Sequence, residues 1–175
     1  MTKRTRKTAR VWILMGSESD YAVMREAENV LDEFGIGYES RISSAHRAPK
    51  RTISLVEEAV RGGAKVIIAG AGAAAHLAGL IAAHTALPVI GVPVNSSPLN
   101  GMDALLSTLQ MPAGVPVATM AVGKAGARNA GIFAVQVLAL NDSNLRAKLA
   151  RYKKRLAKSV EKKDSEFRGA QGNRD

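Results

Sequence analysis

Three loops of this sequence carry side chains that could bind an anion or move a proton. The first, residues 16–20 (GSESD), holds the hydroxyls of Ser17 and Ser19 just before an expected helix. Free backbone N–H groups and the helix dipole favour an anion such as phosphate there. Asp20 would repel a phosphate. Its carboxylate is better suited to bind sugar hydroxyls that lie beside the phosphate. Ser17 and Asp20 also form a plain S-x-x-D capping pair, so this loop alone leaves both interpretations open.

The second loop, residues 43–49 (SSAHRAP), combines an acid–base group with a cation. The Arg47 guanidinium can grip a phosphate or a carboxylate with its planar fork of donors. His46 is the side chain best suited to moving a proton near neutral pH. A surface histidine beside an arginine usually has no further role, but this one follows an expected strand and lies beside a second anion-binding loop. The loops together indicate a small phosphorylated ligand with acid–base chemistry at His46.

The third loop, residues 70–77 (GAGAAAHL), consists of small residues followed by His76 and Leu77. Such runs serve close packing more often than ligand binding, although they also let a ligand approach the backbone. The pattern is not G-x-G-x-x-G with a later acidic residue, and no Walker lysine is present, which disfavours NAD and ATP. The three histidines, which include His84, lack metal-ligand spacing, and the chain has no cysteine. Metal and thiol chemistry are therefore disfavoured as well.

The elements that must position these loops alternate along the chain. We expect strands at 11–15, 37–43, 65–69, 88–92 and 115–121, and helices at 21–34, 49–61, 102–110 and 125–140. This alternation predicts βαβ units and a parallel sheet covered on both faces. The predicted fold class is therefore α/β, a three-layer flavodoxin-like sandwich with a five-stranded parallel sheet. Ligands of such folds bind at the carboxyl ends of the strands, where all three loops lie.

Two helices carry apolar rows whose burial can be predicted. In the helix at 49–61 we expect Ile53, Val56 and Val60 to face the core. An extra C-terminal helix is expected at 142–160, with an apolar row at i+3 and i+4 spacing that ends at Val160. The domain itself or a neighbouring subunit could cover that row.

The net charge of +10 lies at the two ends of the chain. Residues 1–10 carry +5, residues 146–175 carry +7, and the part between them carries −2. We therefore expect solvated basic ends on a nearly neutral body. The predicted organisation is a basic tail at 1–10, a single domain at 11–160 and a disordered polar tail at 161–175. The absence of a membrane-spanning run and of a signal peptide leads us to expect a cytoplasmic protein.

Several segments are familiar when they are taken together. They are GSESD, SAHRAP, AGAGAAAHLAGLIAAHT, PVIGVPV and LQMPAGVPVATMAVGKAGARNA, in register from about Val11 to Leu140. On these motifs the chain resembles the class I PurE family, the N5-carboxyaminoimidazole ribonucleotide mutases, known as the carboxylase-subunit enzymes of bacterial purine synthesis. The resemblance implies a homo-octamer that needs no ATP, metal or organic cofactor. It also implies that the C-terminal helix reaches a neighbouring subunit.

The resemblance assigns roles to residues of all three loops. His46 matches the catalytic histidine of the family. The positions that hold the ribonucleotide or line its pocket are matched by Ser17, Ser19, Asp20, Ser44, Arg47, Gly72, His76 and Leu77. The implied reaction moves a carboxylate from the exocyclic nitrogen of aminoimidazole ribonucleotide to ring carbon 4. In it, His46 gives a proton to the carbamate nitrogen, CO2 leaves and is trapped, carbon 4 attacks it, and His46 takes the ring proton.

The chain departs from the family pattern at two positions. Where the family usually has GAGGAAHLPG, Ala73 replaces a glycine and Ala78 replaces a proline. If the backbone at residue 73 needs a positive φ, an alanine there would be strained by roughly 1 kcal/mol or more. That strain would affect the shape of the pocket that holds CO2.

Functions other than that of the mutase must also be weighed against the sequence. Class II members of the family carboxylate aminoimidazole ribonucleotide directly with CO2. They tend to carry SAHK and to lack the AAHL segment, so Arg47 and residues 74–77 favour the mutase. A nucleic-acid-binding protein that used the basic ends would bind with a steep salt dependence. A non-catalytic flavodoxin-like module for flavin is disfavoured, because no aromatic residue falls in the ligand loops.

Overall fold

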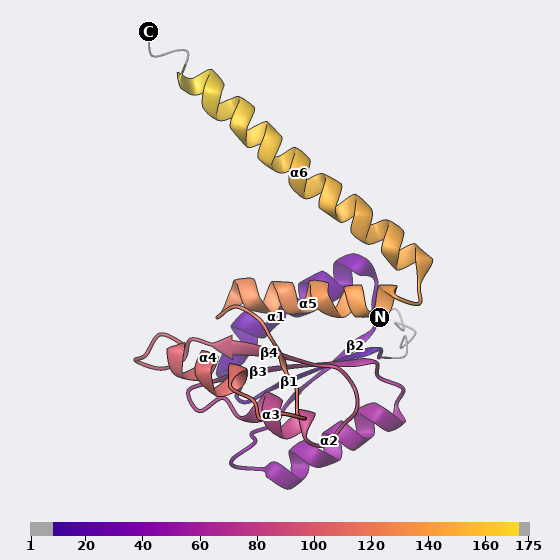
Figure 1. Cartoon of the computed structure of the whole chain (residues 1–175), viewed down its shortest axis with the longest axis vertical. Helices are drawn as coiled ribbons and strands as arrows, with labels where there is room; N and C mark the ends of the chain where they lie inside the picture. Colours follow the sequence, from indigo (N-terminus) through magenta and orange to yellow (C-terminus); the bar gives the residue numbers. More distant parts are fainter. Residues whose placement is uncertain (1–8, 172–175) are drawn as a thin grey trace, which may run out of the picture. The chain divides into compact units, whose positions relative to one another are not determined.

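The computed structural model describes residues 9–171, in which five strands alternate with helices (Figure 1). The strands are β1 (Val11–Met15), β2 (Tyr38–Ile42), β3 (Val66–Gly72), β4 (Val89–Val94) and β5 (Ala118–Thr119). The helices are the short η1 (Glu18–Asp20), α1 (Tyr21–Phe34), α2 (Pro49–Arg61), α3 (Leu77–Ala82), α4 (Met102–Leu109), α5 (Lys124–Ala139) and α6 (Ser143–Gln171). The five expected strands and the expected helices occur in the predicted order, but α3, between β3 and β4, lies where no helix was predicted.

All neighbouring strands of the sheet are parallel, in the order β2-β1-β3-β4-β5. This is the flavodoxin-like order, in which the chain moves to one side of β1 first and then to the other. Helices α1 and α5 cover one face of the sheet, and α2 and α3 cover the other (Figure 1). The predicted fold class, a three-layer α/β sandwich, is therefore confirmed.

The core forms because the central strands are apolar on both faces. Every residue of β1 is buried, since this strand lies between β2 and β3 and has helices above and below. On one face, Trp12 and Leu14 belong to a buried cluster that includes side chains of α2 and α3. On the other face α5 packs closely on α1: a Cβ added at Gly131 would lie 2.9 Å from Cβ of Val30. The sheet is thus held rigidly, and its loops are positioned by it.

Two local expectations differ from the structure. Strand β5 has only two residues, Ala118 and Thr119. Pro116, which has no N–H to donate to the ladder, precedes it and accounts for the later start of the strand. In α2 the buried residues include Leu55 and Val56, but Val60 is 48% exposed. The prediction that Val60 faces the core is wrong, because the buried row continues through Ala59 instead.

The chain consists of two compact units, and the boundary between them falls after Val137. The first unit contains the sheet and the three loops, and the second begins at Leu138 and contains α6. No helix within residues 9–171 is long and apolar enough to cross a membrane. The predicted basic tail at 1–10 lies almost wholly outside the described residues, and the expectation of one domain at 11–160 stays a prediction.

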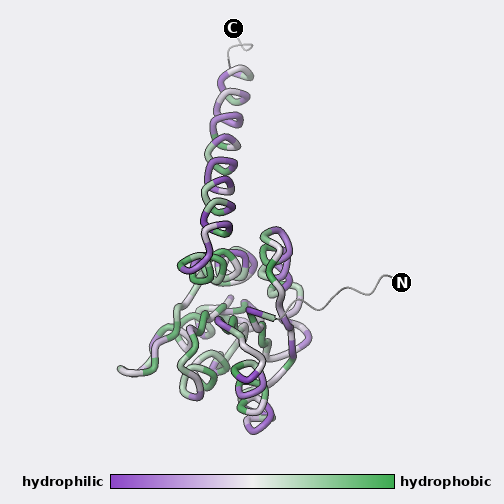
Figure 2. Tube along the Cα trace, turned by 90° about the vertical axis from the view of Figure 1, so that its right-hand side faces the viewer, coloured by the Kyte–Doolittle hydropathy of each residue, from purple (hydrophilic) through white to green (hydrophobic). Residues whose placement is uncertain are grey.

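Helix α6 is longer than expected, since it continues past Val160 to Gln171. Residues 161–171, which were expected to be a disordered tail, are helical here. Two exposed i,i+4 ion pairs, Lys162–Glu166 and Arg168–Asp164, lie in this part of the helix and give it modest local support. Most of α6 is hydrophilic, with hydrophobic residues interspersed (Figure 2). Its predicted apolar row is buried only at the start, and Val160 is 68% exposed.

Candidate active site

A cavity of about 300 Å³ lies at the carboxyl ends of the strands, within the first unit. Backbone hydrogen bonds hold these strand ends together: Ser43 donates to Met15 O over 2.8 Å, and Gly16 donates to Gly70 O over 3.0 Å. All nine residues that the sequence singled out line the cavity: Ser17, Ser19, Asp20, Ser44, His46, Arg47, Gly72, His76 and Leu77. The three loops therefore form one site, as the fold class predicts.

The first loop is the capped helix start that the sequence allowed. The backbone N–H of Ser17 donates to Oδ2 of Asp20 over 3.0 Å, and the Ser19 hydroxyl donates to Ser17 Oγ over 3.0 Å. The capping interpretation is thus confirmed. The same residues line the cavity, so capping and ligand binding are compatible here.

Asp20 is a carboxyl group that is almost entirely buried, with 3% of its surface exposed. Burial raises the pKa of Asp20 above its ordinary value, and hydrogen bonds from the backbone of Ser17 and Gly16 offset part of that rise. The carboxylate accepts a hydrogen bond from Ser17 N–H, which holds it in place in the cavity lining. Such a fixed acceptor suits a ligand hydroxyl, which can donate to it.

The second loop is tied to the first by Arg47. Its backbone N–H and its Nε donate to Oγ of Ser44 over 3.2 and 3.3 Å, and Nη2 donates to the carbonyl of Gly16 over 3.4 Å. These contacts orient the guanidinium along the cavity wall and leave other N–H donors for a ligand. Because a guanidinium is always charged, this side of the cavity attracts anions.

His46 and His76 come from different loops and meet in the cavity. Nε2 of His46 lies 2.8 Å from Nδ1 of His76, and the two rings are almost perpendicular, at 88°. A hydrogen bond between two ring nitrogens requires one N–H and one bare nitrogen. One ring therefore donates its N–H to the bare nitrogen of the other. This arrangement can move a proton to or from a ligand.

The third loop contains the strained residue that the sequence suggested. Ala73 has a φ of 51°, the left-handed region in which alanine is disfavoured relative to glycine. It lies between Gly72 and Ala74, which both line the cavity. The other departure, Ala78, is the second residue of α3, where a proline would also fit. The strain is thus at Ala73, directly before the turn that carries His76.

Sequence reasoning missed Ser96, which follows β4 and lines the cavity. The rule that ligands bind at carboxyl ends of parallel strands would have pointed to it, but the segment has no catalytic motif. Four small residues that were not proposed also line the cavity: Gly16, Ala45, Ala71 and Ala74. Among residues 9–171, no cluster of three His, Asp or Glu side chains could hold a metal ion.

Comparison with known proteins agrees with the geometry. Residues 10–159 match the AIRC family, described as AIR carboxylase. The chain is 51% identical over 163 residues to an N5-carboxyaminoimidazole ribonucleotide mutase of Mycobacterium leprae, covering 93% of this chain and 94% of that one. It is 57% identical over 139 residues to the protein of that name from Bacillus subtilis, covering 79% and 86%.

A solved structure supports the same relationship. The crystal structure of Treponema denticola PurE superposes with a TM-score of 0.81 at 29% sequence identity. The match covers 89% of this chain and 96% of that one. The similarity therefore extends over sequence, fold and nearly the whole length.

Proposed function

Because the chain belongs to the AIR carboxylase family, we propose that it is an N5-carboxyaminoimidazole ribonucleotide mutase. It would convert the N5-carboxylated nucleotide to 4-carboxyaminoimidazole ribonucleotide in purine biosynthesis. The observation that carries this proposal is the identity of about half of all residues, over nearly full length, with proteins of that name. The cavity is consistent with it, because it combines a cation, hydroxyls and an imidazole pair.

In this proposal the nucleotide is held by the first two loops. Arg47 and the serine hydroxyls bind the phosphate, and Asp20 accepts hydrogen bonds from the ribose hydroxyls. Support comes from the position of all these groups in the lining of one cavity. The contacts of Arg47 to Ser44 and Gly16 hold the first two loops together.

The proposed chemistry needs one proton to leave the enzyme and one to return. His46 protonates the carbamate nitrogen, the N–C bond breaks, and CO2 and aminoimidazole ribonucleotide stay in the cavity. Carbon 4 then forms a bond to CO2, and His46 takes the proton that carbon 4 loses, so the imidazole ends as it began. Proton transfer of this kind contributes about 100- to 10,000-fold to a rate, and retention of CO2 in the correct orientation contributes further. His76 would orient His46 through the 2.8 Å contact.

The proposal is tested with purified protein and 4-carboxyaminoimidazole ribonucleotide, without ATP, metal or added bicarbonate. Interconversion with the N5-carboxy isomer, lost in His46→Asn, is the expected result. Decarboxylation to aminoimidazole ribonucleotide that reverses only with added CO2 would identify the class II reaction instead. No reaction of the wild-type protein would overturn the proposal.

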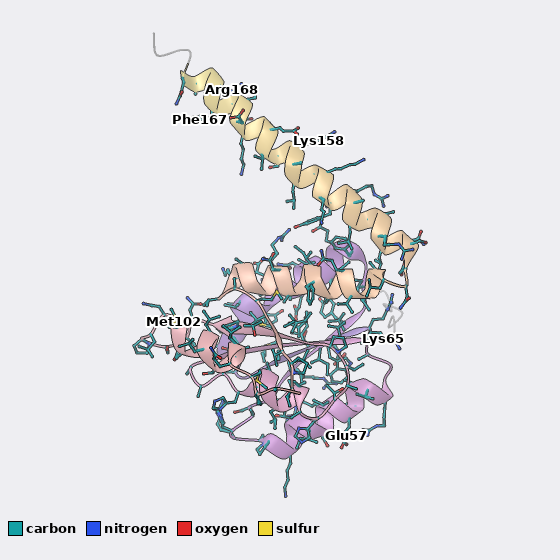
Figure 3. All side chains as sticks on the ribbon, viewed as in Figure 1. Glu57, Lys65, Met102, Lys158, Phe167 and Arg168 are labelled. Atoms are coloured by element: carbon teal, nitrogen blue, oxygen red, sulfur yellow. The ribbon has the colours of Figure 1, made fainter. Side chains whose placement is uncertain are left out.

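We also propose that the protein works as a cytoplasmic homo-octamer. Exposed apolar side chains support an assembly: Leu99 is 64% exposed, and on α4 Met102 and Leu106 are 56% and 49% exposed. Met102 is labelled in Figure 3. Covering such a row by another copy is favourable, because exposed contiguous apolar surface is unusual on a monomer. Light scattering should give eight times the chain mass of 18.5 kDa, and a monomer would contradict this part.

A further inference from the structure

Ser96 is a cavity residue to which the proposed function gives no role. It follows β4, its side chain is exposed to the cavity, and its backbone N–H donates to Val94 O over 3.0 Å. Within residues 9–171 its hydroxyl has no hydrogen-bond partner. A hydroxyl that lines a cavity without a partner can donate to a ligand.

Gly72 is what allows Ser96 to reach the cavity. The two lie at the ends of the paired strands β3 and β4, where Gly72 is opposite Val94. A Cβ added at Gly72 would overlap Oγ of Ser96, and it would lie 2.9 Å from Cβ of Ser96 and 3.0 Å from Val94 O. The Ser96 side chain therefore occupies the space over Gly72, and any larger residue at position 72 would displace it.

The strand order places Ser96 far from the cationic end of the cavity. Arg47 follows β2, and Ser96 follows β4, with β1 and β3 between these two strands. Neighbouring strands lie about 4.8 Å apart, and the Arg47 guanidinium reaches Gly16 at the end of β1, so roughly 10 Å separates it from the end of β4. A nucleotide whose phosphate lies at Arg47 would extend its base towards β3 and β4.

The residues around Ser96 offer few other donors. The cavity lining from the β3 end and the loop after it consists of Ala71, Gly72, Ala74, His76 and Leu77. Among these only His76 has a polar side chain, and it contacts His46. Ser96 is thus the uncommitted side-chain donor at this end of the described cavity. A carboxylate needs such donors, whereas neutral CO2 is a poor acceptor.

We propose that Ser96 Oγ donates a hydrogen bond to the carboxylate that migrates between nitrogen and carbon 4. The inference rests on the proposed function. The hydroxyl can rotate about its Cβ–Oγ bond, so one donor can serve the carboxylate in both isomers. Ser96 then distinguishes the carboxylated nucleotides from aminoimidazole ribonucleotide, which has no carboxylate for it to bind.

The test compares two ligands on one variant. In Ser96→Ala, calorimetry should show about 10-fold weaker binding of 4-carboxyaminoimidazole ribonucleotide, typical of a lost hydrogen bond to a charged group. Binding of aminoimidazole ribonucleotide should change less than about two-fold, because that ligand offers nothing to the hydroxyl. Gly72→Ala should cause a similar selective loss, since it displaces Ser96.

The matched control is Ser97→Ala, which removes a hydroxyl that accepts from the backbone of Leu99 and does not line the cavity. It should leave both affinities unchanged. If Ser96→Ala weakened the binding of both ligands equally, or weakened the binding of neither, the inference would be overturned. Ser96→Gly, which also lacks the hydroxyl, repeats the measurement if the alanine variant does not fold. Wild-type protein that binds and isomerises the substrate keeps the proposed function even if the Ser96 inference fails. Wild-type protein that neither binds nor isomerises the substrate would overturn both the proposed function and the Ser96 inference.

Discussion

Nε2 of His46 lies 2.8 Å from Nδ1 of His76, although 30 positions separate the two residues in the chain. One follows β2 and the other follows β3, and β1 lies between these strands. Both side chains line the same cavity. The contact links the two imidazoles by one hydrogen bond.

Replacement of the two histidines should therefore have unequal effects. His46→Asn should lower kcat by about 100- to 10,000-fold and leave nucleotide binding nearly intact, because it removes the proton carrier. His76→Asn should lower kcat less and should change the shape of the pH–rate profile, because it removes only the partner of His46. Steady-state kinetics over a range of pH checks both. Normal turnover in His46→Asn would remove that residue from the mechanism.

Asp20 should make the folded protein less stable as the pH rises. Burial raises its pKa, so the folded state binds a proton more readily than the unfolded state, whose ordinary value is 3.8. The contribution of Asp20 to the free energy of unfolding is most favourable below the pKa of the unfolded state. It is lost as the pH rises through the pKa of the folded state. Asp20→Asn keeps an oxygen acceptor for Ser17 N–H and should flatten this dependence in urea unfolding between acidic and neutral pH. A slope identical to that of the wild type would contradict the assignment.

Ala73→Gly should stabilise the protein by about 0.5–1 kcal/mol. Glycine relieves the strain of a φ of 51°, and the greater freedom of glycine in the unfolded chain offsets only part of this gain. The control is Ala22→Gly, at an exposed position in the first turn of α1, which should destabilise by up to about 1 kcal/mol. Urea unfolding should therefore show a higher free energy of unfolding for Ala73→Gly and a lower one for Ala22→Gly. Destabilisation by both changes would show that residue 73 is not strained.

Arg47→Lys should raise KM for the nucleotide by about 10-fold or more and change kcat much less. A lysine keeps the charge but loses the planar fork that contacts Ser44 and Gly16 while it faces the cavity. Arg51→Lys, at an exposed position in α2, serves as the control and should be silent. An unchanged KM in Arg47→Lys would place the phosphate elsewhere.

Much of the fold could be predicted because burial leaves a local pattern. The fully apolar run of β1 and the glycine that ends α1, with a φ of 73°, mark their elements directly. The errors occurred where the pattern is ambiguous. At β5 a proline delays the start of the strand, and in α6 the helix continues through the polar residues after Val160, where ion pairs give it modest local support.

The sequence by itself determined the class of fold and the three loops, because strand ends and loop composition are local properties. The full set of nine residues expected in the site followed from the resemblance of its motifs to the PurE family. Only the tertiary structure decided that His46 meets His76, that Gly72 makes room for Ser96, and that Ala73 adopts a positive φ. These relationships depend on strand order and on packing between segments distant in the chain. No spacing within one segment encodes the distance between two loops, since that distance arises only when the sheet has formed.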